Sequence, residues 1–276
     1  MSFYISLSGL KASQVDLSTI SNNVANVNST AFKKSKTIFG DIFAAAPMQT
    51  TNQVSGQGVR VQGVTQQFTQ GTLETTDKTL DMAIAGEGYF TVKGEDGTIS
   101  YTRNGAFAVD DNRFAVDTTG ARIQIFPVDP QTGVPTGNPA TATPADLTDL
   151  NIPTSANNAQ LTSVGVDKKG MVSAVYADGS TVYLGQVAMA TFNSQEGLRQ
   201  EGDAHWSANV ASGDPIFGTA NQGMYGSVNS GMLERSNVDI TDELVALIAA
   251  QRNFQANSKA IEAANTLTTT IVNLRT

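Results

Sequence analysis

Residues 239–274 read DITDELVALIAAQRNFQANSKAIEAANTLTTTIVNL, and the rest of the chain is organised around this stretch. Large apolar residues recur in it at helical spacing, and the predicted stripe comprises Ile240, Leu244, Leu247, Ile248, Phe254, Ile261, Leu267, Ile271 and Leu274. Ile240, Leu247, Phe254 and Ile261 lie seven residues apart, which predicts an amphipathic helix packed against another helix. Asp239 is the expected N-cap, at the end where the helix dipole favours an anion.

The opposite end of the chain offers a partner for this helix. Residues 1–27 carry a second apolar stripe, formed by Phe3, Leu7, Leu10, Leu17, Ile20, Val24 and Val27. Four of these positions, Phe3, Leu10, Leu17 and Val24, again lie seven residues apart. At about 1.5 Å per residue, a helix over residues 1–27 spans roughly 40 Å. The matching period predicts that the two terminal helices pack side by side.

The face of the first helix that lies outside the stripe is polar but almost uncharged. Between Ser13 and Thr30 it is mostly Ser, Thr, Asn and Gln, and Asp16 is the one charge. Solvated helix faces usually carry Lys, Glu and Arg, whereas an uncharged face can be packed without burying a charge. Ser and Asn also weaken an isolated helix. We therefore expect the chain ends to become ordered on packing, either against each other or against copies of the same chain.

The residues between the two helices predict a β-rich insertion. Residues 29–75 are expected to form an extended connection, and residues 44–58 lack periodicity and predict a linker. Further on, short β-branched and aromatic runs alternate with turn sequences such as GEDGT (94–98) and DDNRF (110–114), and residues 129–145 predict a long surface loop. The predicted fold class is α+β. Its discontinuous coiled-coil domain comprises residues 1–28 and 239–276, and its mainly antiparallel β domain comprises residues 76–238.

Composition limits the classes of function. The chain has 276 residues, of which 40% are hydrophobic and 15% are charged, with a net charge of −8 and no cysteine. A negative chain without a basic patch is not expected to bind nucleic acid, and the absence of cysteine excludes disulfides and thiolate metal sites. No apolar run approaches about 18 residues, so no membrane insertion is expected. The N-terminus lacks the basic and apolar regions of a cleaved signal peptide.

The sequence contains no recognisable set of catalytic residues. Its one histidine, His205, stands beside its one tryptophan, Trp206, in a Gly-rich stretch, where a packed or surface role is the commoner one. One histidine and no cysteine do not supply a typical zinc site. The G-x-G segments at residues 56–58 and 86–88 do not complete a dinucleotide-binding motif. We therefore predict no enzyme activity and no catalytic, cofactor or metal site.

Three ordered motifs carry a resemblance to a known family. The opening SGLKASQVDLSTISNNVANVNSTAFKK, the middle stretch LDMAIAGEGYFTV followed by YTRNGAFAVD, and the end GMLERSNVDITDELVALIAAQRNFQANSKAIEAANTLTTTIVNLR resemble the bacterial flagellar hook and rod proteins. Within this family, the opening MSFYISLSGL, the SNVD segment and the VNLR ending resemble hook proteins. Residues 44–58 and the stretch LNIPTSANNAQLTSVGVDKKGMVS resemble the distal rod proteins.

The resemblance implies a structural role. It implies export through the flagellar type III apparatus without a cleaved signal, and terminal helices that pair as a coiled coil in the inner tube of a helical homopolymer. The two stripes would then lie at subunit interfaces, and the β domain would form the outer layer. Expected partners are identical subunits and other axial proteins of the rod, the hook–filament junction and the hook cap.

Two assignments within the family remain open, and two lie outside it. The first is the extracellular hook, the universal joint that transmits torque from rod to filament, and the second is the distal rod, a drive-shaft subunit that spans the periplasm. Outside the family, a secreted β-rich binding module predicts a stable monomer with protected termini. A β-rich hydrolase is the remaining alternative, and it lacks a recognisable site.

Overall fold

The computed structural model describes residues 2–43, 56–137, 139, 142–156 and 159–273. The chain divides into two compact units. The first, which we call the helical unit, comprises Met1–Asn28, Lys33–Gln67 and Val238–Thr276. The second, the β unit, comprises Ser29–Phe32 and Phe68–Asn237. Both chain termini belong to the helical unit, so the β unit is an insertion between the two ends of the chain.

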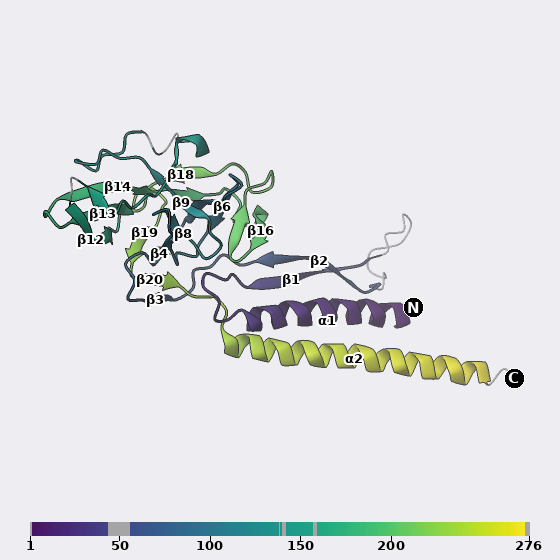
Figure 1. The fold of residues 1–276 in the computed structure, drawn as a ribbon. Helices are drawn as coiled ribbons and strands as arrows, with labels where there is room; N and C mark the ends of the chain where they lie inside the picture. The colour runs from purple at the N-terminus through teal and green to yellow at the C-terminus, as the bar shows by residue number, and fades with distance from the viewer. Residues whose placement is uncertain (1, 44–55, 138, 140–141, 157–158, 274–276) are drawn as a thin grey trace. The chain divides into compact units, whose positions relative to one another are not determined.

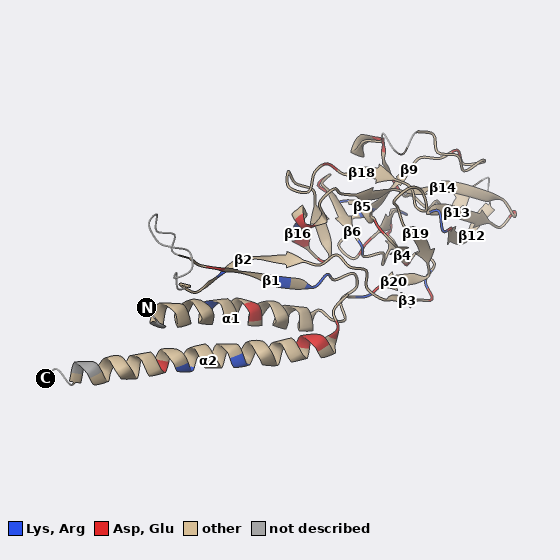
Figure 2. Ribbon diagram, turned by 180° about the vertical axis from the view of Figure 1, so that it is seen from behind, with Lys and Arg blue, Asp and Glu red and all other residues tan. Residues whose placement is uncertain are grey.

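The helical unit contains both terminal helices and one β-hairpin. Helix α1 spans Ser2–Ala25 and helix α2 spans Ile240–Asn273, which confirms the two predicted helices. Strands β1 (Ser35–Asp41) and β2 (Val59–Gln66) form an antiparallel pair. Helix α1 contacts α2 on one side and both strands on the other, so it lies in the middle of this unit (Figures 1 and 2).

The hairpin lies within the segment for which we expected an extended connection. Its register pairs Ser35 with Gln66 and Asp41 with Val59, with an irregularity between Ile38 and Phe39. The alternating sequence VRVQGV at residues 59–64 is typical of a strand, and its partner strand is found 18 or more residues earlier in the chain. Most of the predicted linker, residues 44–55, lies outside the described residues.

The β unit is built from many short strands. They are β3 (Leu73–Thr75), β4 (Met82–Ala85), β5 (Tyr89–Lys93), β6 (Ile99–Thr102), β7 (Ala108–Val109), β8 (Ala115–Val116), β9 (Arg122–Phe126), β10 (Thr148–Asp149), β11 (Ser155–Ala156), β12 (Ala159–Val166), β13 (Met171–Tyr176), β14 (Thr181–Val187), β15 (Met189–Thr191), β16 (Arg199–Gly202), β17 (His205–Ser207), β18 (Ile216–Gly218), β19 (Ser227–Ser230) and β20 (Met232–Glu234). Two 3-10 turns span Pro144–Asp146 and Gln195–Gly197.

One 14-stranded sheet dominates this unit. Its main path runs β11-β12-β13-β14-β9-β5-β6-β17-β16, and two smaller sheets pair β19 with β4 and β20 with β3. Every strand pairing within the described residues is antiparallel. Turns at residues 94–98 and 110–114 connect β5 to β6 and β7 to β8, as predicted. The α+β fold class with a mainly antiparallel β insertion is therefore confirmed.

Strand β5 lies at the centre of the β-unit core. Successive residues of a strand point to opposite faces of the sheet, and both Tyr89 and Phe90 are fully buried. Phe90 joins an aliphatic cluster with Ile123, whereas Tyr89 joins an aromatic cluster with Trp206. Because both faces of this strand are covered, YFTVK is nearly continuously apolar instead of alternating.

Both ring nitrogens of His205 have a hydrogen-bond partner in the β unit. Its Nε2 lies 2.6 Å from Asp117 Oδ2, and its Nδ1 lies 2.9 Å from the carbonyl oxygen of Asp203. Both ring nitrogens face acceptors, so both must donate, and this geometry favours the doubly protonated ring. The other carboxylate oxygen of Asp117 accepts the backbone N–H groups of Thr119 and Ala121. The pair therefore holds β17 against the turn that follows β8.

Burial and pairing act in opposite directions on these two groups. Burial alone would lower the pKa of His205, but the hydrogen bond and charge of Asp117 outweigh it and raise that pKa above its ordinary value. Burial would raise the pKa of Asp117, but hydrogen bonds from His205 and Thr119 hold it below its usual range. Glu95, Asp96, Glu201 and Asp203 line a cavity beside the ring. Of these acids, Asp203 also raises the pKa of His205, through the hydrogen bond to its backbone and through its charge.

We expect the β unit to lose stability as the pH rises through the folded-state pKa of His205. A raised pKa contributes stability that is fully present below the unfolded value of about 6.5 and is lost above the folded value. His205 is the single histidine, and Trp206 is the single tryptophan, so fluorescence-detected unfolding at several pH values measures this effect. In His205→Gln, the midpoint should no longer fall across this pH range, and at mildly acidic pH the β unit should be less stable by about 1.5–3 kcal/mol. An unchanged pH profile in the variant would contradict the charged-pair assignment.

Candidate assembly site in the helical unit

Two contacts fix the register between α1 and α2. Near one end, a Cβ atom on Gly9 would lie 2.8 Å from Asn257 Oδ1, so the missing side chain at Gly9 allows close approach of the helices. Near the other end, Asn23 Nδ2 donates to Glu243 Oε2 at 3.2 Å. The same number of residues separates the two contact positions on each helix, and the helices run antiparallel. The pair is therefore aligned along its whole shared length.

Asn23 joins three parts of this unit. Its Nδ2 donates to the carbonyl oxygen of Ser35 at 2.8 Å as well as to Glu243, and its Oδ1 accepts the Ser35 N–H at 2.9 Å. Asn23 is 1% exposed and Glu243 is 9% exposed. Because a buried amide or carboxylate without partners costs free energy, these groups are stable only when α1, β1 and α2 are all in place.

The start of α2 is capped as the sequence predicts. Asp239 accepts the backbone N–H groups of Thr241 at 2.8 Å and Asp242 at 3.3 Å, and its carbonyl oxygen accepts the N–H of Glu243. The Thr241 N–H, then the Asp242 N–H, hold the pKa of the Asp239 carboxyl below its usual range, and the charge of Lys34 adds to the effect. The cap places Glu243 one turn into the helix, where it reaches Asn23.

The α1 stripe lies largely within the unit. Ile20 is buried, Phe3 is 37% exposed, and the other members, Leu7, Leu10, Leu17, Val24 and Val27, are half-buried. On α2, Leu247, Phe254 and Ile261 are half-buried, whereas Ile240, Leu244, Ile248 and Leu267 are exposed. The side chain of Ile271 and the whole of Leu274 lie outside the described residues.

The predicted α2 stripe requires one correction. Leu244 and Ile248 are exposed and do not lie on the face of α2 that packs against α1, whereas Leu247 does. The residues of that packed face are spaced alternately four and three positions apart. Its positions are Glu243, Leu247, Ala250, Phe254, Asn257, Ile261 and Ala264. Only every second position is large and apolar, so the sequence pattern favoured the neighbouring Leu and Ile. The packed face, or seam, could have been identified from the small or polar residues that follow Ile240, Leu247, Phe254 and Ile261 by three positions.

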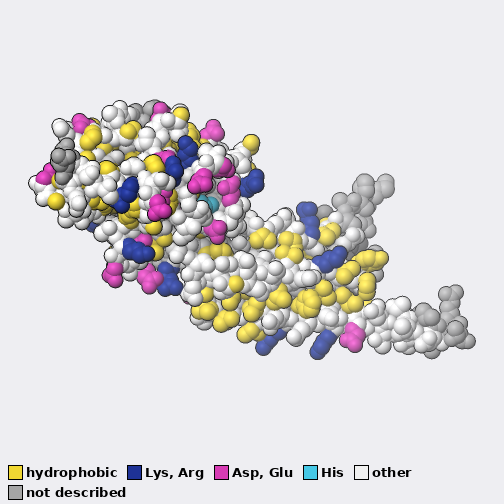
Figure 3. Space-filling view, in the orientation of Figure 1, with side chains coloured by type: hydrophobic (Ala, Val, Ile, Leu, Met, Phe, Trp, Pro, Cys, Tyr) yellow, Lys and Arg dark blue, Asp and Glu magenta, His cyan; other side chains and the backbone are white. Residues whose placement is uncertain are grey.

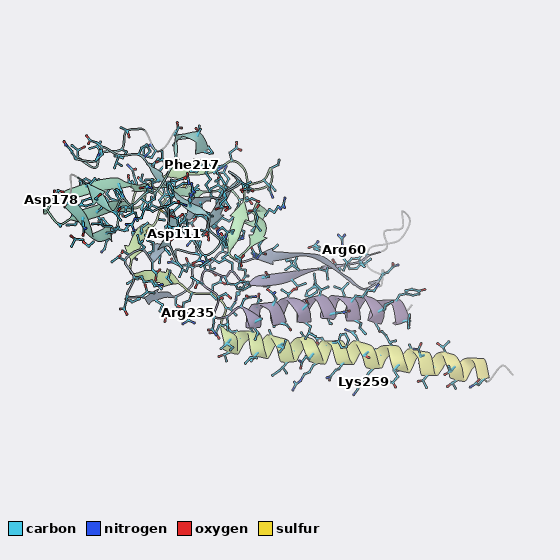
Figure 4. The ribbon with its side chains drawn as sticks, viewed as in Figure 1. Arg60, Asp111, Asp178, Phe217, Arg235 and Lys259 are labelled. Carbon is cyan, nitrogen blue, oxygen red and sulfur yellow. The ribbon has the colours of Figure 1, made fainter. Side chains whose placement is uncertain are left out.

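Most of the exposed large apolar side chains among the described residues belong to the helical unit. They are Phe3, Tyr4 and Ile5 on α1, Ile38, Phe39, Phe43 and Val64 in the hairpin region, and Ile240, Leu244, Val245, Ile248 and Leu267 on α2. Figure 3 shows hydrophobic side chains gathered along this unit. Charges are sparse on both helices (Figure 2), and Lys259 lies on the side of α2 that faces away from α1 (Figure 4). An exposed apolar surface of this kind is typical of a protein-interaction site.

Two other kinds of site are absent from the residues that the structure describes. Within them, no group of three or more His, Asp or Glu side chains is placed to hold a metal ion. No helix in the described part of the chain is both long and apolar enough to cross a bilayer.

Replacing Asn23 should destabilise the helical unit specifically. Asn23→Ala leaves the Glu243 carboxylate and the backbone of Ser35 without their partner, which costs about 1–3 kcal/mol for an unsatisfied buried group. Thermal unfolding followed by far-UV circular dichroism should show helix loss at a lower temperature, while Trp206 fluorescence still reports a folded β unit. Asn22→Ala is the matched control, because Asn22 is an exposed neighbour of the same type. Equal effects of the two substitutions would contradict the role given to Asn23.

Three protein families match parts of this chain. The family described as "Flagella basal body rod protein" matches residues 3–33, and "Flagellar hook protein FlgE/F/G D1 domain" matches residues 83–174. A third family, "Flagellar basal body rod FlgEFG protein C-terminal", matches residues 229–274. The matches include α1, the strands from β5 to β12, and α2.

Curated relatives match along the whole chain. The flagellar basal-body rod protein FlgG of Bacillus subtilis is 36% identical, over 99% of this chain and 98% of its own length. FlgG of Buchnera aphidicola subsp. Acyrthosiphon pisum is 34% identical, over 94% of each chain. The flagellar hook protein FlgE of Escherichia coli K12 is 27% identical, over 100% of each chain. This chain therefore belongs to the family of flagellar hook and basal-body rod proteins, the structural proteins of the flagellar axis.

Proposed function

We propose that this chain polymerises with identical copies into a helical tube of the flagellar axis, with the helical unit as the assembly surface. The observation that carries the proposal is the exposed apolar surface of the helical unit. In the monomer, Leu244, Val245 and Ile248 are exposed to water. Covering them with a second subunit lowers the free energy by about 25 cal/mol per Å² of apolar area. Tubular growth requires contacts between two different patches of each subunit, because a contact between identical patches closes into a two-fold dimer.

The terminal helices are proposed to pair as a coiled coil. The alternating four- and three-residue spacing of the α2 seam is the spacing that coiled coils use. The sequence-predicted interface residues divide into two groups under this proposal. Leu247, Phe254 and Ile261 hold α2 against α1, whereas Ile240, Leu244, Ile248 and Leu267 remain available for a second subunit.

Other partners follow from membership of the family. We propose contacts with further axial proteins, among them those of the rod, the hook–filament junction and the hook cap, and export through the flagellar type III apparatus without a cleaved signal. The β unit is proposed to form the outer layer of the tube. A chain that crosses an export channel must fold afterwards, and the Asn23 contacts with Ser35 and Glu243 would form at that stage.

The hook is the first assignment within the axis, and the distal rod is the second. The hook assignment is supported by the sequence resemblance and by a hook relative that matches this chain from end to end. The alignment with that relative spans 409 positions, whereas this chain has 276 residues. The distal rod is favoured by length, since the Bacillus relative aligns over 291 positions at higher identity. The hook assignment places the protein outside the cell, and the rod assignment places it in the periplasm.

Removing Val272–Thr276 should hinder polymerisation and leave the β unit folded. The shortened chain loses the end of α2, which we place in the assembly surface. Purified chains can be compared by sedimentation and electron microscopy, with Trp206 fluorescence as the control for folding. Wild-type assembly by the shortened chain would count against the proposal, as would a wild-type chain that stays monomeric with both termini protected from proteolysis.

Hook and rod assignments can be separated in cells. Under the hook assignment, the gene should restore motility to a strain that lacks its hook gene. Under the rod assignment, it should restore motility to a strain that lacks its distal rod gene. Electron microscopy of isolated basal bodies then locates the tagged chain. Tagged, curved tubes outside the outer membrane support the hook, and straight tagged segments between the membranes support the rod.

A further inference from the structure

The C-terminal end of α2 extends beyond its partner helix. The register set by Gly9 with Asn257 and by Asn23 with Glu243 places Ser2, the start of α1, opposite Ala264. Residues 265–273 therefore form an overhang, about 13 Å long at roughly 1.5 Å per residue. The described side chains at residues 265–270 are all exposed, and Leu267 is 65% exposed. Within its own chain, the helical pair gives this overhang no covering surface.

The composition and the hydrogen bonds of the overhang lower the cost of burying it. It carries no charged residue, and its threonine hydroxyls bond the helix itself. Thr266 donates to the Glu262 carbonyl at 2.9 Å, Thr268 to Ala264 at 2.8 Å, and Thr270 to Thr266 at 2.8 Å. Thr269 bonds the carbonyls of Asn265 and Thr266. Because these hydroxyls already have acceptors, covering the surface leaves no threonine donor unsatisfied, which removes the main cost of burying Thr.

A groove lies toward the opposite end of the same helical unit. It encloses about 570 Å³ between α1, β1 and the first turns of α2. Its apolar lining includes Ile20, Phe39, Ala246, Ala249 and Ala250, where the alanines leave room for an incoming side chain. Its volume falls within the range of about 300–1,000 Å³ that is usual for binding pockets.

The charges around the groove suit the end of a helix. Lys36 lies exposed at the groove, beside Lys34. The C-terminal end of a helix carries unsatisfied carbonyl groups and the negative end of the helix dipole. Asp16 and Glu243 also line the groove, and Glu243 is bonded to Asn23. The overhang has no charged side chain and would bring the negative pole of its helix toward these lysines. Arg275, which follows the overhang in the sequence, has the sign opposite to that of Asp16 and Glu243.

We propose that the overhang of α2 in one copy of this chain docks in the groove of the next copy, with Leu267 entering beside Ala249. The inference rests on the proposed polymerisation and specifies one of its contacts. The overhang and the groove lie toward opposite ends of one unit, so docking is head-to-tail and can repeat from copy to copy, as the proposed polymer requires. The contact cannot form within one chain, because Leu267 and Ala249 are 18 residues apart on one helix, or about 27 Å.

Disulfide trapping tests the contact directly. The chain has no cysteine, so a Leu267→Cys, Ala249→Cys double variant carries only the two test thiols. A disulfide needs Cα atoms within about 7 Å, which excludes a bridge inside one chain. Polymers of this variant, oxidised and then denatured without reductant, should give a ladder of covalent oligomers. The matched control, Leu267→Cys with Gln251→Cys, should give no ladder, because Gln251 is exposed on another face of α2.

The outcomes separate this contact from the polymer itself. A ladder from the test pair alone supports the docking. Polymers without a ladder, or equal ladders from both pairs, overturn the docking and leave the proposed function standing. If the wild-type chain forms no polymer, both fall. Should the double variant fail to assemble, the two single-cysteine variants are mixed at low fraction into wild-type chains, where the docking predicts covalent dimers between them.

A change in the critical concentration provides a second measurement. Leu267→Asp should raise it by about tenfold or more, because a large apolar side chain is no longer buried and a carboxylate must be desolvated beside Ala249. Leu267→Met should leave it within about threefold, since both side chains are apolar and of similar volume. Equal critical concentrations for Leu267→Asp and the wild type would overturn the docking.

Discussion

The antiparallel contact between α1 and α2 is the interaction on which the rest of this structure depends. It joins the two ends of a long chain, and the β unit is inserted between them. The contact is narrow, because its seam alternates large side chains with Ala, Asn and Glu. Gly9 allows the close approach at one end, and Asn23 supplies the hydrogen bonds at the other. Register is therefore set by polar and steric matching more than by the amount of buried apolar surface.

The two units satisfy their buried polar groups in different ways. In the β unit, charged groups are paired inside the fold, as with His205 and Asp117, or with Arg103 and Glu234 at 3.4 Å. In the helical unit, α1 carries only Lys11 and Asp16 as charged residues, and hydroxyls on both helices bond the helix backbone. A paired interior suits a unit that folds alone. Surfaces without charge suit a unit that is completed by neighbours, since desolvating them costs little.

Several features followed from local sequence. The heptad spacing of Leu247, Phe254 and Ile261 predicted α2, and Asp239 predicted its cap, because both depend on residues within one or two turns. Turn sequences such as GEDGT predicted hairpins for the same reason. The packed face of α2 was predicted only in part. Leu244 and Ile248 are as apolar as Leu247, and the choice among them depends on where Gly9 and Asn23 of the other helix lie.

The sequence by itself determined the helices at both ends, the β-rich middle, the uncharged polar surface and the family, since each is carried by residue type and local spacing. Only the tertiary structure decided which apolar residues face α1, that β1 and β2 pair beside it, and that α2 extends past its partner. The first and third of these features depend on the register between α1 and α2, whose contacts join residues more than 200 positions apart. Register is fixed by contacts such as Gly9 with Asn257, which have no counterpart in local sequence pattern.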